Sequence, residues 1–586
     1  MTYSSLRALL VKRFHIPKER LVRKTMRHFT LAEKAIFYFF VTLFILSGIS
    51  LLNQVNNAFL VEVPLRGGSI TEGVVGNPRF INPVLAFTEA DKNLTALIYS
   101  GLVRMDTKGN PINDLAESVN ISADGLTYTA HIRSDAVFQD GVKVTSDDID
   151  FTIQKIENIS IKSPLFGNWN GVAVSKPDEN TIVFTLKKPF AAFMDNLTLG
   201  ILPKHIWKNV TDEEFSFSQF NSLSIGSGPY KINSVERNSG GIPDYYDLVP
   251  FEKVVGQEPF VSHLIFRFYP SQADLLNGYN NGDIQNVSGF SPEETSLLKN
   301  SNATIFSSPL PRIFAVFFNQ NQSQVLLDKA VRQALDLTAP REEIVKDVFH
   351  GYATAIQSPL PPGLFDWSAY NPQIASIDDR IAQAQSILAK AGWTKNTQTG
   401  LLEKKSKKDT MTLTFSISTG DAPELKAVAQ KLQTNWAKLG AKVDILVFES
   451  GDLNQNVIRP RKFDALLFGE IVGRDALMYP FWHSSERNDP GLNVALYANP
   501  KVDKLLEDAR STTSNSQRES DYKSFNKEIQ NDEPAVFLYA PSFLYMVPKD
   551  VKAVTLGELS SSQDRFLGIR NWYIETNNVW KIFVNN

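Results

Sequence analysis

An uncharged run of 18 residues near the N-terminus, residues 35–52 (AIFYFFVTLFILSGISLL), limits the folds open to this chain. As a helix this run would span roughly 27 Å, about the thickness of a bilayer's hydrocarbon core. Nine basic residues and two acids, Glu19 and Glu33, precede it. The basic residues are Arg7, Lys12, Arg13, Lys18, Arg20, Arg23, Lys24, Arg27 and Lys34. The positive-inside rule therefore predicts residues 1–34 as a cytoplasmic tail, with everything after residue 53 outside the membrane.

Two other interpretations of this run are a buried core helix and a cleaved signal peptide. A core helix would show a polar stripe, whereas only Thr42, Ser47 and Ser50 interrupt the apolar side chains. A cleaved signal has a shorter basic region and a small-residue cleavage site, which residues 56–59 (NNAF) do not provide. We therefore predict an uncleaved transmembrane signal anchor over 35–52. Residues 53–65 would then form a tether that reaches about 40 Å if extended.

The rest of the chain has the composition of a globular protein. Of all 586 residues, 43% are hydrophobic and 21% are charged. Beyond residue 34 there are 51 basic and 61 acidic residues, a net charge of −10. Such an acidic body is unsuited to nucleic acid. The chain has no cysteine, which excludes disulfides, thiolate metal sites, cysteine nucleophiles and a lipid-modified N-terminal cysteine.

The second half of the chain carries a strand–helix–strand pattern. Residues 411–417 and 443–447 alternate apolar and polar side chains, as in half-buried strands. Between them, apolar residues at three- and four-residue steps over 425–439 predict an amphipathic helix that ends at Gly440. A second such stripe over 381–391 ends at Gly392. A strand, a helix and a strand with short links predict a right-handed parallel crossover and an α/β domain.

The first half is different in pattern. Residues 128–138 and 182–186 are typical of strands, joined by turns such as Asp124-Gly125 and Asp140-Gly141. We therefore expect an α+β lobe in the first half, and a mixed α/β and α+β fold for the whole body.

A series of short motifs follows in a fixed order along the body. The motifs are Asn82-Pro83, residues 98–103 (IYSGLV), 115–118 (LAES), 124–129 (DGLTYT), Phe138, Asp140-Gly141, 145–151 (TSDDIDF), 202–205 (LPKH), 226–230 (GSGPY), 331–335 (VRQAL), Gly351-Tyr352 and 391–393 (AGW). Together they resemble the family 5 extracellular solute-binding proteins, the dipeptide-, oligopeptide- and nickel-binding components of ABC importers. The resemblance runs from about residue 66 to the C-terminus.

The resemblance implies a bilobed, periplasmic-binding-protein-like type II fold with an extra inserted domain, preceded here by one transmembrane helix. Lobe 1 would be discontinuous, with residues 66–107, 225–311 and 541–586. The small inserted domain would cover 108–224, and lobe 2 would cover 312–540. Ligand would bind between the lobes and close them.

The resemblance also implies where ligand binds in lobe 2. Residues 468–475 (FGEIVGRD) follow a predicted strand, at the end where α/β domains place ligands. In peptide-binding relatives the matching loop offers an acid to the ligand's ammonium group, and Asp475 is the best-aligned acid. Glu470 and Arg474 belong to the same candidate site, although Arg474 and Asp475 could equally pair with surface neighbours. Trp482 would either floor a pocket or pack in the core.

On lobe 1, the loop from Asn77 to Pro83 matches the position where relatives run alongside ligand. Asn77 and Phe80 are therefore candidate ligand contacts. Tyr539, near the place where the chain returns to lobe 1, is another.

No enzyme motif stands out. The seven histidines are scattered, and no metal-spaced pair, nucleophile elbow or phosphate-binding loop occurs. We therefore predict a non-enzymatic, monomeric, membrane-anchored solute-binding protein without a cofactor, which binds short peptides outside the cell membrane and passes them to ABC permease subunits. The alternatives are a nickel-, haem- or oligosaccharide-binding member of the family, or an anchored chaperone or sensor ectodomain.

Overall fold

The computed structural model describes residues 26–190, 192–298, 302–362, 376–406, 410–473 and 478–584. They belong to two compact units. The larger unit runs from Arg66 to Glu575, and the smaller one combines the residues up to Leu65 with those from Thr576 onward.

The smaller unit is built on helix α3 (Leu31–Phe59), which has no buried residue. A capping box starts it, because the Thr30 N–H donates to the Glu33 carboxylate at 2.8 Å and the Thr30 hydroxyl accepts from the Glu33 N–H at 3.4 Å. Within the described chain, α3 alone is long and apolar enough to cross a membrane. The helix continues past the predicted span because residues 53–59 contain neither Pro nor Gly.

An antiparallel ribbon completes the smaller unit. Strand β1 (Leu60–Pro64) pairs with β23 (Thr576–Trp580), with Leu60 opposite Trp580. The segment 53–65, which we predicted as a tether, is helical as far as Phe59, and its residues 60–64 form strand β1. Residues 576–584, which we expected in lobe 1, belong to the smaller unit.

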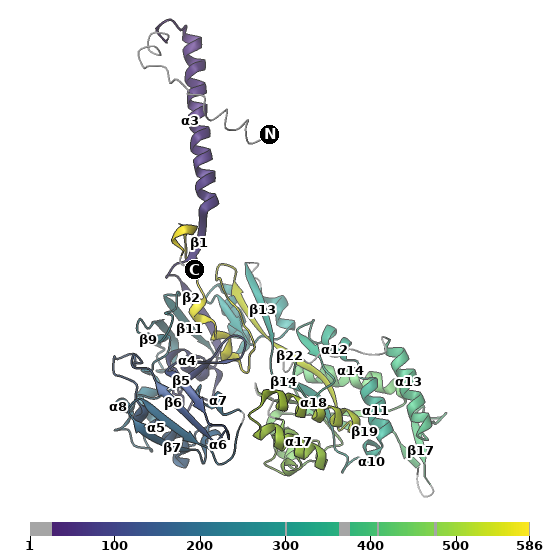
Figure 1. Cartoon of the computed structure of the whole chain (residues 1–586). Coiled ribbons are helices and arrows are strands. Elements are labelled where there is room, and N and C mark those ends of the chain that lie inside the picture. The colour runs from purple at the N-terminus through teal and green to yellow at the C-terminus, as the bar shows by residue number, and fades with distance from the viewer. Residues whose placement is uncertain are drawn as a thin grey trace, which may run out of the picture. The chain divides into compact units, whose positions relative to one another are not determined.

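Twelve strands of the described chain form one large sheet in the larger unit. Its main order is β20-β19-β21-β14-β22-β12-β2-β11-β10-β9, and β13 and β15 also pair with β22. The bounds are β2 Ser69–Val75, β9 Tyr230–Arg237, β10 Pro243–Pro250, β11 His263–Tyr269, β12 Asn286–Ser288, β13 Ala303–Pro309, β14 Arg312–Phe318, β15 Ala353–Ala355, β19 Thr414–Gly420, β20 Lys442–Phe448, β21 Ala465–Ile471 and β22 Ala535–Pro548. Strand β22 pairs first with β14 and then with β13, so it runs through both halves of this sheet (Figure 1).

The predicted parallel crossover is present as β19, α14 (Pro423–Leu439) and β20. Gly440 ends α14 in the left-handed conformation, with φ of 89°. Other helices of this part are α10 Gln324–Leu327, α11 Lys329–Leu337, α12 Arg341–Asp347, α13 Ile377–Lys390, α15 Ser450–Asp452, α16 Tyr479–Trp482, α17 Pro500–Ser511 and α18 Asn515–Asp532. Separate apolar cores cover the two faces of the sheet here, one including Trp436 and the other Trp482.

A small sheet, β5-β6-β8-β7, lies in the first half of the chain. Its bounds are β5 Ala116–Ile121, β6 Thr127–Ile132, β7 Ala173–Asp178 and β8 Thr181–Thr185. Helices α5 (Ser146–Glu157), α6 (Phe166–Trp169), α7 (Phe193–Asn196) and α8 (Lys204–Trp207) accompany it (Figure 1). The strand predicted over 128–138 ends at Ile132, because the chain then turns: the Ala136 N–H donates to the Arg133 carbonyl at 3.2 Å, and Arg133 forms a 2.9 Å ion pair with Asp135.

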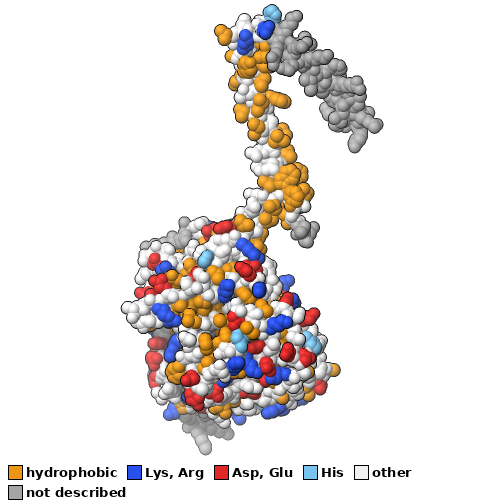
Figure 2. Space-filling model, turned by 90° about the vertical axis from the view of Figure 1, so that its left-hand side faces the viewer, with side chains coloured by type: hydrophobic (Ala, Val, Ile, Leu, Met, Phe, Trp, Pro, Cys, Tyr) orange, Lys and Arg blue, Asp and Glu red, His pale blue; other side chains and the backbone are white. Residues whose placement is uncertain are grey.

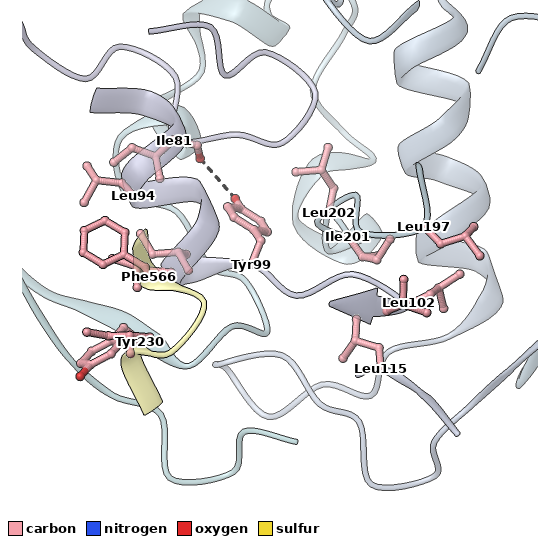
Figure 3. Packing of buried hydrophobic residues seen from close by; sticks show 14 of the residues in the cluster. Ile81, Leu94, Tyr99, Leu102, Leu115, Leu197, Ile201, Leu202, Tyr230 and Phe566 are labelled. Carbon is pink, nitrogen blue, oxygen red and sulfur yellow. Dashed lines mark hydrogen bonds between the residues drawn. The ribbon is translucent and has the colours of Figure 1, made fainter. Parts of the chain in front are cut away.

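The remaining α-helices and strands are α4 Glu89–Ile98, α9 Gln272–Asn281, β3 Val103–Met105, β4 Pro111–Asn113, β16 Thr394–Lys395, β17 Leu402–Lys405 and β18 Thr410–Thr412. Around α4, one core joins residues far apart in the sequence, including Leu94, Tyr230 and Phe566 (Figure 3). The Tyr99 hydroxyl donates to the Ile81 carbonyl at 3.4 Å. This hydrogen bond links the loop before α4 to the apolar core just after that helix.

Candidate functional site

The loop from Asn77 to Pro83 is held by one carboxylate. Asp91, in the first turn of α4, accepts the backbone N–H groups of Arg79 at 2.7 Å and Phe80 at 2.8 Å. Its second oxygen accepts the Thr88 N–H at 3.1 Å, which closes a capping box. An acid at this end of a helix also meets the positive end of the helix dipole. Asp91, which we did not single out from the sequence, therefore fixes the shape of this loop.

The predicted contacts of this loop differ in exposure. Asn77 is exposed, whereas Phe80 is half-buried and packs against the core. The guanidinium of Arg79 lies 5.6 Å from the centre of the Phe80 ring. Of the two predicted residues, Asn77 is thus freer to reach a ligand, and exposed Arg79 lies between them.

Strands β21 and β22 and helix α16 hold a different set of predicted residues. Glu470, in β21, is only 4% exposed, and neither carboxylate oxygen has a hydrogen-bond partner among the described residues. Burial raises the pKa of this carboxyl well above its usual value, although neighbouring Trp482 acts in the opposite direction. The Trp482 indole N–H is not aligned for a hydrogen bond. Burial therefore favours the protonated, neutral form of Glu470 over the carboxylate.

Trp482 belongs to the core and does not floor a cavity. Its side chain is fully buried, 6.1 Å from the Phe317 ring and 5.8 Å from the Phe537 ring. Of the two interpretations that we gave this residue, the structure shows the packed one.

Tyr539 lies on the opposite face of the sheet from Glu470. In the register of β14, Ile313 pairs with Glu470, whereas the next residue, Phe314, pairs with Tyr539. Neighbouring residues of a strand point to opposite faces. Tyr539 stacks on Phe314 at 4.8 Å, and its buried hydroxyl has no hydrogen-bond partner in the described chain. The structure therefore does not bring Glu470 and Tyr539 together.

Arg474 and Asp475 lie outside the described residues, which stop at Gly473 and resume at Met478. Their predicted role in holding a ligand's ammonium group stays a prediction.

A cavity of about 470 Å³ lies between the small sheet and helices α16 and α17. Ten residues from two stretches, 167–172 and 186–193, line one side, and Tyr479, Pro480, Glu486 and Arg510 line the other. The two sides touch nearby, since a Cβ atom on Gly125 would lie 2.5 Å from the Thr513 methyl group. The cavity therefore opens between two parts of the chain that meet at its edge.

Cations dominate the charged lining of this cavity. Lys187 and Lys188 come from one side, and Arg510, 4.8 Å from the centre of the Tyr479 ring, comes from the other. None of the three has an ion pair within the described ranges, and Glu486 is the sole acid among the lining residues. Three unpaired cations around a cavity suit an anionic group. The sequence signal that we missed is the basic pair before Pro189, and nothing local marks Arg510.

A second cavity, of about 440 Å³, lies beside α4 and is lined by Lys92, Thr95, Asp114, Asp195 and Arg570 among others. Burial raises the pKa of Asp114, against the opposing effect of Arg570, whose guanidinium lies 3.6 Å away. Of the predicted site residues that the structure describes, none lines either cavity. Among the described residues, no three His, Asp or Glu side chains come together as a metal site would require.

Comparison with known proteins identifies the family. Residues 110–489 match the model of the bacterial extracellular solute-binding proteins, family 5, middle region. The chain belongs to this family. The family 5 model covers the small sheet, strands β9 to β21 and the lining of the 470 Å³ cavity as far as Glu486. Its members bind solutes outside the cytoplasm, which agrees with the mixed α/β fold and with the resemblance found in the motifs.

Individual relatives cover most of the chain. It is 26% identical to the oligopeptide-binding protein AppA of Bacillus subtilis (strain 168) over 495 residues, which is 83% of this chain and 89% of AppA. The structure of AppA in complex with a nonapeptide matches with a TM-score of 0.64, covering 88% of this chain and 100% of that one at 26% identity. NikZ from Campylobacter jejuni in complex with Ni(L-His) matches with a TM-score of 0.65, covering 86% of this chain and 99% of that one at 28% identity.

Proposed function

We propose that this chain is a membrane-anchored extracytoplasmic solute-binding protein that captures short peptides between its two lobes. It then hands them to the permease of an ABC importer, without catalysing a reaction and as a monomer. The observation that carries the proposal is the cavity between the small sheet and α16–α17, in a family whose relative AppA is seen with a nonapeptide. Its volume of about 470 Å³ lies in the range of small-ligand sites.

The anchor in this proposal is helix α3. Its apolar stretch, with the basic residues before it, supports a single-pass span with the N-terminus in the cytoplasm. The larger unit would divide into lobe 1 (66–107, 225–311 and 541–575), the small domain (108–224) and lobe 2 (312–540). The chain crosses between the lobes at the start of β14 and within β22, which would form the hinge.

The chemistry of the two sides fits a peptide with charged ends. An ammonium group needs an acid, for which Asp475 is our candidate, and a carboxylate needs bases such as Lys187, Lys188 and Arg510. The cleft would pair with the peptide backbone and leave the peptide's side chains in wet pockets, which gives broad specificity.

Ligand binding to the purified full-length protein in detergent tests the proposal. Mass spectrometry of co-purified molecules, followed by calorimetric titration with peptides of graded length, should identify peptides as ligands. Peptide at a hundredfold excess over Kd should add about 2.7 kcal/mol to the free energy of unfolding. The melting temperature should rise accordingly. If no peptide binds and a nickel–histidine chelate does, the peptide assignment is wrong.

A further inference from the structure

The C-terminal end of the chain exposes apolar side chains beside helix α3. Ile582 is 75% exposed and Phe583 is 74% exposed, and Trp580 and Phe59 are about half exposed. In Figure 2 hydrophobic side chains gather along this helix and around its C-terminal end. Exposed apolar side chains that are contiguous with a membrane-spanning helix mark a surface that lipid covers.

The antiparallel pairing of β1 and β23 directs the residues after Trp580 back toward helix α3. Because β23 is antiparallel to β1 and Trp580 pairs with Leu60, the chain after Trp580 runs past the start of β1, toward the end of α3. Residues 581–583 then form a single 3₁₀ turn. In Figure 1 this yellow turn is drawn beside β1, at the end of α3.

Two contacts fix the height of Trp580 on the helix. Its indole N–H donates to the Asn56 side chain at 2.9 Å, and its ring stacks on Phe59 at a centroid distance of 6.3 Å. Asn56 lies four residues beyond Leu52, which is roughly 6 Å along the axis. A headgroup layer is roughly 5–8 Å thick. The indole ring therefore lies at the depth where Trp is enriched in membrane proteins.

We propose that residues 580–584 are a second membrane contact, an interfacial wedge that inserts Trp580, Ile582 and Phe583 into the outer headgroup layer. This inference rests on the proposed anchoring role of α3. Lys581, between the apolar residues, can extend its ammonium group to lipid phosphates while its stem stays among apolar groups. The partner is thus the lipid of the membrane that α3 spans.

A fluorescent depth measurement tests the wedge, and the absence of cysteine from the chain leaves no background labelling. The full chain carries one cysteine at a time, labelled with an environment-sensitive dye and reconstituted in vesicles of phosphatidylcholine and phosphatidylglycerol. Val584→Cys reports on the wedge, and exposed Asn578→Cys on β23 is the matched control. Leu46→Cys, within α3, reports on the anchor itself.

We expect the dye at position 584 to shift its emission to the blue, to lose quenching by aqueous iodide and to be quenched by shallow lipid-borne nitroxides. The dye at 578 should behave as in water. Ile582→Ser with Phe583→Ser, added to the Val584→Cys chain, should return its dye to water. If the dye at 46 is in lipid while the dye at 584 stays aqueous, the wedge is wrong and the anchor stands. An aqueous dye at 46 would overturn the anchor and the wedge together.

Discussion

Asp475 tests the proposed ligand chemistry at the scale of one residue. A peptide ammonium that enters a closed cleft loses water, and an unpaired buried charge is costly. We expect Asp475→Asn to weaken peptide binding by roughly 2–5 kcal/mol in calorimetric titrations. Acetylation of the peptide's N-terminus should weaken binding to the unmodified protein similarly, and binding to the variant much less. Additive losses would mean that another acid holds the ammonium group.

Burial of the Glu470 carboxyl predicts that the stability of the protein depends on pH. Burial raises the pKa of this carboxyl from its ordinary 4.5 in the folded state. The protein therefore takes up a proton at Glu470 when it folds. The contribution of this carboxyl to stability is complete below its ordinary pKa and is lost as the pH rises through its pKa in the folded state. Gln cannot ionise. We therefore expect Glu470→Gln to gain stability over the unmodified protein above about pH 5, by up to about 1.4 kcal/mol per pH unit.

Urea unfolding at several pH values measures this difference. The control is Glu213→Gln, which changes an exposed carboxylate. Its stability curve should run parallel to that of the unmodified protein. Parallel curves for Glu470→Gln as well would show that the Glu470 carboxyl is ionised in the folded protein.

Helix α4 carries the prediction at the scale of an element. Asp91 accepts N–H groups both from its own helix start and from the loop at Arg79 and Phe80. We expect Asp91→Ala to lower the free energy of unfolding by about 2 kcal/mol, and Thr88→Ala, which removes only the cap, by about 1 kcal/mol. Equal losses in denaturant unfolding would show that the loop does not depend on Asp91.

Elements with a strong apolar period could be predicted from the sequence, and those whose ends depend on single contacts could not. Strands β19 and β20 and helix α14 follow from the 2- and 3.6-residue periods, because one face of each is buried. The end of β6 depends instead on the turn at Arg133 and Asp135. No sequence signal marks the end of α3, because the Asn and Gln residues that follow the apolar run can lie in either a helix or a loop.

The candidate site was predicted less well, because it depends on register between strands distant in sequence. Placing Glu470 and Tyr539 on opposite faces requires the pairing of β14 with both β21 and β22, which no local pattern reveals. The cavity brings Lys187 and Lys188 within reach of Arg510, more than 300 residues later. Charges that meet only through the tertiary fold leave no spacing in the sequence.

At the scale of the whole molecule, the cations that line the cavity are predicted to bind the carboxylate of the peptide. We expect Lys187→Gln with Lys188→Gln to weaken binding of a peptide with a free C-terminus about threefold, since partly exposed ion pairs contribute roughly 0.2–1 kcal/mol each. Binding of the C-terminally amidated peptide should not change. Exposed Lys208→Gln, away from the cavity, is the control. An equal loss for the acid and the amide would mean that the peptide's carboxylate lies elsewhere.

Strand β22 restricts the motion open to the larger unit. Its residues up to Pro541 pair with β14 and β15, and those from Ser542 onward pair with β13 and β12. A strand that is bonded on both sides of one point can bend or twist there, but it cannot slide without breaking its ladder on one side. The proposed opening of the lobes would therefore be a torsion about residues 540–542. The amides of β22 on either side should resist deuterium exchange equally well in the open and the closed protein.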